Sequence, residues 1–246
     1  NHRSGLIWWR AYFKKNWKGS WLQRRQQLSN LLQKETCKVQ KTATYSDVDY
    51  LTLGFVLETL LNKNLLNCWQ QLNQYFPSND FHFLTQRPQH NYLYAPTFSH
   101  QKGHKWVQAL VNDANTQAFG GISSHAGLFG QIEDVSTWLL SLRESLYKDK
   151  GFVKRKTLKH FMKRSMKPHQ GDWALGFMLP GKNSTSGKYF SKSSIGHLGF
   201  TGTSFWWDPK KDVFIVLLAN RYINSQKGEE FRNLRPLIHN EIMELI

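Results

Sequence analysis

The sequence has few cysteines and no apolar run long enough to cross a membrane. Its two cysteines, Cys37 and Cys68, lack metal-ligand spacing, so they can pair with each other or stay free, and they do not fix the compartment. The longest apolar runs, such as 213–219, fall far short of the roughly 20 residues of a transmembrane helix. Phosphate-loop, dinucleotide-binding and zinc-ribbon patterns are also absent, so no cofactor is predicted.

Acidic residues are scarce as well. The chain holds 33 Lys and Arg against 17 Asp and Glu, which gives a net charge of +16. Such a protein is attracted to polyanions, which include nucleic acids, acidic lipids and anionic wall polymers. The basic residues are scattered along the chain rather than gathered on a recognisable reading element, so specific nucleic-acid binding is not predicted. The densest segment, 154–164, alternates with apolar residues at helical spacing, which is typical of a solvated helix face.

The first residues contain no initiator Met and no charged segment followed by an apolar segment of signal-peptide type. We therefore expect the sequence to begin inside a longer product, and the sequence leaves the compartment undetermined.

Hydrophobic residues make up 40% of the chain, with ten Trp, nine Tyr and sixteen Phe, which predicts a large aromatic core. Segment 76–121 is irregular and proline-bearing, and we expect it to form a wall or lid of a site. Helical patterns precede strand patterns along the chain, which predicts an α+β fold in one domain, 1–246, helical to about 170. The predicted helices are 20–32, 48–63, 65–75, 132–146, 154–165 and 229–246, and the predicted strands are 173–179, 197–207 and 213–219.

The stretch 196–221, GHLGFTGTSFWWDPKKDVFIVLLANR, is the most informative part of the chain. Two strand-like runs flank the turn 208–212, which predicts an antiparallel hairpin. Gly199 and Gly202 lie in the first run, within 197–203. Glycine weakens a strand unless something must approach the backbone closely, so this strand either edges a binding site or is an ordinary edge strand.

Three residues are candidates for chemistry on residue type alone. Tyr45 precedes a predicted helix and could act as a general base beside a cation, or it could simply pack. His197 could contact a substrate, or it could be a structural hydrogen-bonding group. Gly199 would let the N–H of the following residue stabilise an oxyanion.

His100 and His104 have the i, i+4 spacing of a helical metal site. Gly103 disfavours a helix there, and no carboxylate lies close by in the sequence. No metal site is predicted.

Several motifs together resemble one family. They are HRSGL at 2–6, Tyr45-Ser-Asp before an apolar helix, GGISSHAGLFG at 120–130, WALGFMLP at 173–180 and the stretch 196–221. In this order they resemble the serine β-lactamase and penicillin-binding-protein family, and most of all its class C-related esterases and low-molecular-mass penicillin-binding proteins. The resemblance implies a β-lactamase/transpeptidase-like fold with an antiparallel sheet and a helical region.

The resemblance also implies acyl transfer, in which the Ser of a Ser-x-x-Lys motif attacks a β-lactam, peptide or ester carbonyl. Tyr45 matches the Tyr that assists the base. Asp47 matches the third position of a Tyr-x-Asn motif, where Asn is commoner. His197 matches the Lys of a Lys-Thr-Gly motif, and a titrating His there suits an esterase- or peptidase-like member better than a β-lactamase.

The same motif implies that Gly199, Phe200 and Thr201 form the substrate-binding and oxyanion edge, with the N–H of Phe200 as the donor. By the same resemblance, the substrate would be a small molecule or peptidoglycan-like, and the protein would be bacterial and periplasmic or otherwise extracytoplasmic. Anionic polymers are further partners suggested by the charge.

The nucleophile itself is not identified. Ser-x-x-Lys occurs at 99–102 and 145–148, but both matches lie after the Tyr motif, and neither is predicted to be the nucleophile. The resemblance thus implies a family domain without its first quarter, and we expect these 246 residues to be inactive on their own. The alternative is a non-catalytic member of the fold that binds cell-wall or protein partners.

Overall fold

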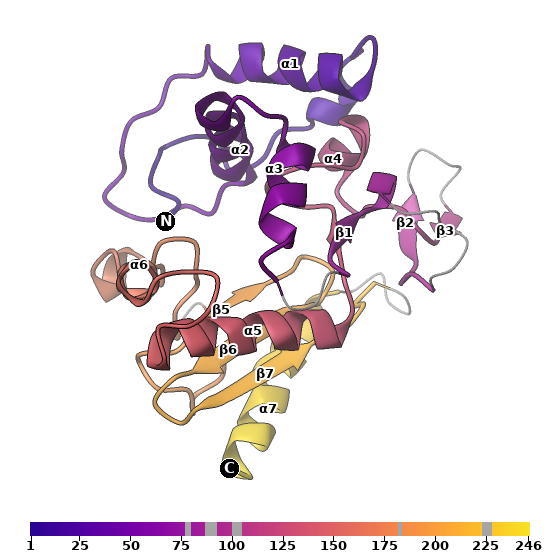
Figure 1. Ribbon diagram of the computed structural model, residues 1–246. Helices are drawn as coiled ribbons and strands as arrows, with labels where there is room; N and C mark the ends of the chain where they lie inside the picture. Colours follow the sequence, from indigo (N-terminus) through magenta and orange to yellow (C-terminus); the bar gives the residue numbers. More distant parts are fainter. Residues whose placement is uncertain (77–79, 87–92, 100–104, 182–183, 223–227) are drawn as a thin grey trace. The chain divides into compact units, whose positions relative to one another are not determined.

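The computed structural model describes residues 1–76, 80–86, 93–99, 105–181, 184–222 and 228–246. These residues form two compact units (Figure 1). The N-terminal unit comprises His2–Tyr75 and Asp80–Gly130, and the C-terminal unit comprises Gln131–Ile246 together with Phe76. The single domain over 1–246 stays a prediction.

The N-terminal unit is mainly helical, as the sequence predicts. The described part of segment 76–121, which the sequence predicts to be irregular, carries three short strands, one short 3-10 helix and one short α-helix. The elements of this unit are η1 (Tyr12–Lys14), α1 (Trp21–Leu32), α2 (Asp47–Leu61), α3 (Leu65–Asn73), β1 (His82–Phe83), η2 (Leu84–Gln86), β2 (Thr97–Ser99), β3 (Lys105–Val107), α4 (Ala114–Ala118) and β4 (Leu128–Phe129), with β1 paired to β4 and β2 to β3.

Short polar side chains define where these helices begin. The hydroxyl of Ser20 accepts from the amide of Gln23, whose side chain accepts from the amide of Ser20 in return, which makes a capping box. The hydroxyl of Ser46 accepts from the amide of Asp49 at 3.2 Å, so Ser46 caps α2. The same helix ends at Asn62, which adopts the left-handed conformation with φ of 49°.

The core of the N-terminal unit joins α1 and α2 to two aromatic residues outside them. Leu28 of α1 and Leu51 of α2 are almost fully buried against Tyr12 and Phe119. The amide side chain of Asn115 accepts from the backbone of Phe13 at 2.9 Å, and so links α4 to the segment around η1. Tyr45 and Ser46 precede α2, so this core fixes the helix on which the Tyr motif stands.

The C-terminal unit contains the three-stranded sheet and the remaining predicted helices, so the α+β class is confirmed. Its elements are α5 (Ile132–Tyr147), α6 (Arg155–Met162), η4 (Pro168–Gln170), β5 (Ile195–Leu198), β6 (Ser204–Asp208), β7 (Val213–Leu217) and α7 (Glu229–Glu244), and the antiparallel strand order is β5-β6-β7.

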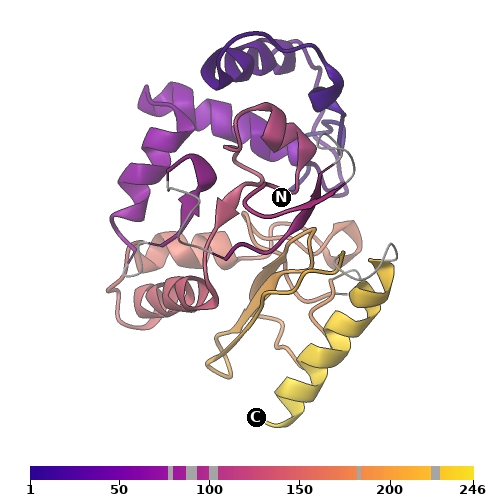
Figure 2. The ribbon, with the colours of Figure 1, turned by 90° about the vertical axis from the view of Figure 1, so that its right-hand side faces the viewer.

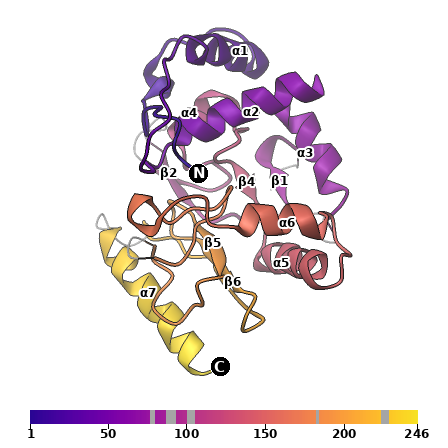
Figure 3. The same ribbon diagram turned by 90° about the vertical axis from the view of Figure 1, so that its left-hand side faces the viewer.

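The sheet of this unit lies between helices on both faces, with α5 and α6 on one side and α7 on the other (Figures 2 and 3). Side chains of a strand alternate between the faces. Trp207 packs with Leu139 of α5 and Leu158 of α6, whereas its neighbour Trp206 packs with Met243 of α7. Burial on both faces explains the nearly continuous apolar sequence of the hairpin.

The predicted strand 173–179 is wrong. Trp173 and Met178 form a single bridge across a turn, with the amide of Ala174 donating to the carbonyl of Phe177 at 2.9 Å. Gly176 adopts φ of 85°, a value that glycine reaches readily and that allows the chain to reverse there. Met178 alone continues to the sheet, through a bridge to Gly196.

Within the described residues, no helix has the length and apolar character needed to span a bilayer.

Candidate functional site

Tyr45 lies directly before the N-cap of α2, and a hydrogen bond with the carboxyl group of Asp47 is one of the influences on its pKa. Burial and the charge of Asp47 both raise the pKa of Tyr45, and Tyr50 and Asp113 add to the effect. The phenol is therefore neutral and donates to Asp47.

Asp47 faces a second carboxylate and an imidazole. Nε2 of His125 lies 3.1 Å from Oδ1 of Asp113, and Nδ1 of the same ring lies 2.7 Å from the hydroxyl of Ser123. Burial raises the pKa of Asp47, with Asp113 adding to the rise and His125 opposing it. In Asp113, hydrogen bonds from His125 and from the Thr116 amide outweigh burial and lower the pKa.

The groups of Asp47, Asp113 and His125 could serve a divalent cation, because one ligand atom from each lies within 4.8 Å of the others. Their atoms already have partners, however. His125 bonds with Asp113 and Ser123, and Asp47 accepts from Tyr45. We interpret the cluster as a hydrogen-bonded network of these side chains.

The HRSGL segment packs behind Tyr45. The imidazole of His2 is fully buried, and its Nδ1 lies 3.1 Å from the amide of Ser46 and 3.3 Å from the carboxylate of Asp49. This nitrogen accepts from the amide when it carries no proton and donates to Asp49 when it does. The hydroxyl of Ser4 also donates to Asp49. Although burial opposes them, these two bonds lower the pKa of Asp49.

His197 lies on β5 in the C-terminal unit, with Nδ1 3.0 Å from the carbonyl of Leu198 and its ring 5.7 Å from that of Trp173. The structure thus places Tyr45 and Asp47 in one unit and the His197 motif in the other. The role of His197 stays a prediction.

The two glycines of the His197 motif do not lie inside a strand, which corrects the sequence expectation. Strand β5 ends at Leu198, and the amide of Gly199 donates to the carbonyl of Thr203 at 2.7 Å to close a turn. A Cβ at Gly199 would lie 2.0 Å from the Thr203 hydroxyl, and one at Gly202 would lie 2.9 Å from the carbonyl oxygen of Ala219. The turn itself therefore requires both glycines.

Phe200 and Thr201 form the tip of this turn. Phe200 is 70% exposed, and within the described part of the chain its amide donates to no acceptor. The carbonyl of Thr201 accepts from the amide of Arg221 at 2.8 Å. The Arg221 guanidinium lies 4.8 Å from the ring centre of Phe200. The sequence assigns no role to Arg221, because a basic residue after a strand does not by itself indicate a site.

Sequence reasoning also assigned no role to Asp113 or His125. His125 stands in the GGISSHAGLFG motif, where a polar residue among glycines could have marked it as a candidate site residue. Nothing in the spacing of Asp113 connects it to that loop, and only folding brings the two together.

The Ser-x-x-Lys matches remain poor nucleophile candidates. The Ser145 hydroxyl is fully buried in α5 and donates to the carbonyl of Ser141 at 2.9 Å. Ser99 ends β2, and its side chain, like Lys102, His100 and His104, falls outside what the structure describes. Cys37 and Cys68 are both free thiols.

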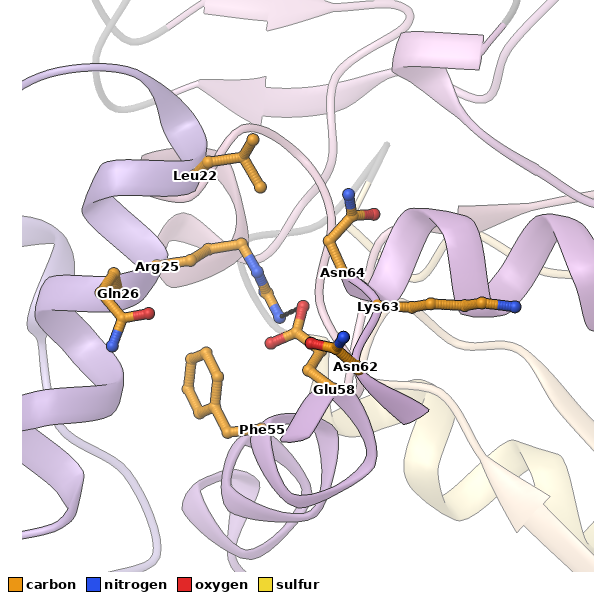
Figure 4. A pocket seen from close by; sticks show the side chains of 8 residues that line it. All are labelled: Leu22, Arg25, Gln26, Phe55, Glu58, Asn62, Lys63 and Asn64. Atoms are coloured by element: carbon orange, nitrogen blue, oxygen red, sulfur yellow. Dashed lines mark hydrogen bonds and ion pairs between the residues drawn. The ribbon is translucent and has the colours of Figure 1, made fainter. Parts of the chain in front are cut away.

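A pocket of the N-terminal unit lies away from these residues, between α1 and α2 (Figure 4). Two of its charged side chains, Arg25 and Glu58, bond with each other. Arg25 bonds with Glu58 and with the carbonyl of Ile122, both at 2.9 Å, and Glu58 accepts from the amide of Leu65 at 2.6 Å. The guanidinium also lies 5.0 Å from the ring centre of Phe55. These bonds tie three helices together, which is a structural role.

Comparison with known proteins supplies a family. The family model described as Beta-lactamase matches residues 1–235. A protein of Salmonella gallinarum, named "Putative D-alanyl-D-alanine carboxypeptidase", is 30% identical over 196 residues, which cover 72% of this chain and 45% of the relative. A Salmonella typhi protein of the same name matches equally. The chain spans less than half the length of these relatives.

Solved structures agree on the fold. Simvastatin synthase from Aspergillus terreus aligns with a TM-score of 0.62 at 14% identity, covering 98% of this chain and 66% of that one. A penicillin-binding protein from Bacillus halodurans aligns with a TM-score of 0.60 at 15% identity, covering 96% and 71%. The expected β-lactamase/transpeptidase-like fold is thereby confirmed.

Proposed function

Because the chain belongs to the Beta-lactamase family, we propose that it supplies part of the acyl-transfer site of a serine hydrolase that acts on a β-lactam, peptide or ester. The observation that carries this proposal is the half-buried cluster beside Tyr45 at the start of α2, in which one ligand atom each of Asp47, Asp113 and His125 lies within 4.8 Å of the others. Perturbed titratable groups of this kind are typical of functional sites.

In this proposal Tyr45 handles the proton. A neutral phenol can donate to a leaving group, and a cation placed beside it would lower its pKa so that it could also accept. Asp47 holds the hydroxyl in place. His197 takes the position of the Lys-Thr-Gly cation, as the family resemblance implies.

The turn Gly199–Thr203 supplies the oxyanion donor. The exposed turn residue Phe200 has an amide without an acceptor in the described part of the chain, which leaves that N–H available to a developing oxyanion. Gly199 and Thr201 hold it at the end of β5. Arg221 adds a fixed positive charge at this turn, which suits a substrate that carries a carboxylate. Since a Salmonella gallinarum relative is named for D-alanyl-D-alanine carboxypeptidase, a peptide ending in D-alanine is the first substrate to test.

We further propose that the 246 residues alone are inactive, because they present no nucleophile at the position where the family has one. The purified chain should neither hydrolyse a chromogenic β-lactam or a p-nitrophenyl ester nor be labelled by a fluorescent penicillin. Labelling that disappears in Ser145→Ala or Ser99→Ala would overturn this part of the proposal.

The gene sequence upstream of Asn1 tests whether a longer product carries the nucleophile. If it encodes Ser-x-x-Lys, the longer product should be labelled by penicillin, and Tyr45→Phe should slow acylation by about 10²–10⁴-fold. A Tyr45→Phe product that is acylated at the normal rate would show that Tyr45 does not handle the proton. By family resemblance we propose a periplasmic or otherwise extracytoplasmic location.

A binding function is the second candidate, and one surface favours it. Segment 150–171 contains no Asp or Glu. Four exposed lysines on and beside α6 form no ion pair with any described residue. Other basic side chains of the described residues do form ion pairs. These are Lys154, Lys156, Lys159 and Lys163. Unpaired positive charge of this density would hold an anionic wall polymer through screened electrostatics.

Peptidoglycan pull-down at rising salt tests this candidate. Lys156→Gln/Lys159→Gln/Lys163→Gln should release the polymer at lower salt than a charge-matched control. The control is Lys34→Gln/Lys38→Gln/Lys41→Gln, in the exposed segment after α1. Equal behaviour of the two triple variants would leave α6 a solvated helix face. Retention of DNA at physiological salt would favour nucleic acid instead.

A further inference from the structure

We propose that His125 is a positioning residue which, paired with Asp113, keeps Asp47 as the carboxylate that accepts the Tyr45 hydroxyl proton in a hydrogen bond. The consequence for catalysis rests on the proposed function. The charge relation among these side chains does not, and it can be measured without any turnover.

The loop that carries His125 is held rigidly. Gly120, Gly121 and Gly127 adopt φ of 85°, 80° and 107°, which fixes a path that other residues rarely follow. The hydroxyl of Ser124 donates to the carbonyl of Tyr50 in α2 at 2.6 Å. Gly54 of α2 accommodates that serine, since a Cβ there would lie 2.2 Å from its hydroxyl. The loop is thus anchored to the helix that begins beside Tyr45.

The imidazole is fixed at both nitrogens. Ser123 meets Nδ1 at 2.7 Å and Asp113 meets Nε2 at 3.1 Å, and the His125 side chain is only 5% exposed. Asp113 is held in turn, because its Oδ1 caps α4 through the amide of Thr116 at 2.6 Å. Geometry therefore leaves the ring little freedom to turn away from the carboxylates.

Two half-buried carboxylates beside each other repel unless a cation lies with them. The titratable groups that act on Asp47 are His125, Asp113, Tyr45 and His2, and the one bonded to His125 among the described residues is Asp113. Asp113 has the stronger set of hydrogen bonds, so a proton taken up by the pair goes to Asp47. A protonated Asp47 is a poor acceptor, and Tyr45 would lose the partner that orients its hydroxyl.

The sign of the pH effect follows. Because the pKa of Asp47 is raised, its charge is lost as pH falls, starting at a higher pH than for an ordinary Asp. Removing His125 removes a group that lowers this pKa. Asp47 would then be protonated at a still higher pH, and the Tyr45 contact would weaken over the same range.

Carbon-13 NMR of Asp carboxyl and Tyr Cζ signals tests the inference on the 246-residue chain. Asp47→Asn and Tyr45→Phe assign the two signals. In His125→Gln the proton affinity of Asp47 should rise about tenfold or more, and the Tyr45 signal should follow the same titration. The control is His160→Gln, an exposed His on α6, which should change neither signal.

An Asp47 titration that is unchanged in a folded His125→Gln variant would overturn the inference. If circular dichroism shows that this variant does not fold, the Asp47 titration is measured in Ser123→Ala instead. It frees the ring from one side without changing any charge, and it should shift the Asp47 titration in the same direction by a smaller amount. An unchanged titration there contradicts the inference equally. Failure of the longer product to be labelled by penicillin would refute the proposed function while leaving this titration intact.

Discussion

The ring of Tyr45 lies against the buried ring of His2, with 4.6 Å between their centres. Backbone bonds reinforce this contact, because the amide of Thr44 donates to the carbonyl of His2 at 2.9 Å and that of Asp47 to Trp8 at 3.0 Å. The first residues of the chain are therefore part of the Tyr motif in space. The family resemblance joined the HRSGL segment and the Tyr motif only by their order in the sequence.

Ser46 caps α2 and also donates to the carbonyl of Ile7 at 2.8 Å. Ser46→Ala should lower the free energy of unfolding by about 1–2 kcal/mol, because both bonds are lost at a fully buried position. Urea denaturation measures this change. Ser136→Ala is the matched control, since its exposed hydroxyl only bonds back to Ile132 within α5, and it should change stability far less.

An ion pair between buried Arg25 and half-buried Glu58 joins α1 to α2 (Figure 4). Glu58→Leu should destabilise the chain by about 3–5 kcal/mol, because it leaves the Arg25 charge buried without its partner. The double variant Arg25→Leu/Glu58→Leu should recover most of that loss. Thermal and urea unfolding measure these changes. The reasoning would be contradicted if the double variant lost as much stability as the two single variants lose together.

The turn after β5 requires glycine at position 199. Gly199→Ala should cost about 1–3 kcal/mol, since its methyl group would overlap the hydroxyl of Thr203. Thr203→Ala removes that obstacle, so the double variant Gly199→Ala/Thr203→Ala should be more stable than the sum of the single changes predicts. Strict additivity would show that the glycine is needed for something other than this contact.

Asp208 should give stability that depends on pH. It is fully buried at the end of β6, and although burial opposes them, bonds from Ser191 and from the amides of Lys210 and Lys211 lower its pKa. Its contribution to the stability of the fold is therefore complete above the pKa of an unfolded Asp, near 4. That contribution is lost as pH falls through the lower pKa of Asp208 in the folded state. Asp208→Asn should cost about 1.5–3 kcal/mol at pH 7.

Urea denaturation between pH 7 and pH 3 checks this expectation. The difference between wild type and Asp208→Asn should narrow below about pH 4. Asp212→Asn serves as the control on the same turn. Asp212 pairs with Arg143 at the surface, where solvent screens the pair, so its effect should be much smaller at every pH. A constant difference for Asp208→Asn would mean that the carboxylate charge is not what stabilises the turn.

The hairpin of β6 and β7 and most helices could be predicted, because their signals are local. Ser46 caps α2, and Trp206 and Trp207 alternate between the two faces of the sheet. The predicted strand 173–179 failed because a single glycine, Gly176, reverses the chain there. Gly199 and Gly202 were placed in a strand for a similar reason, since the sequence shows a glycine but not the φ it adopts or the atom it approaches.

The amino-acid sequence by itself determined most of the helices, the hairpin, the excess of positive charge and the family, since these depend on local pattern and on motif order. Only the tertiary structure brought Asp113 and His125 to Asp47, and His2 to Tyr45. These contacts join residues far apart in the chain, and they depend on loop paths set by glycine conformations and on burial. Loop paths and burial cannot be read from the spacing of residues in the sequence. Together they decide which carboxylate is charged and where the Tyr45 hydroxyl is held.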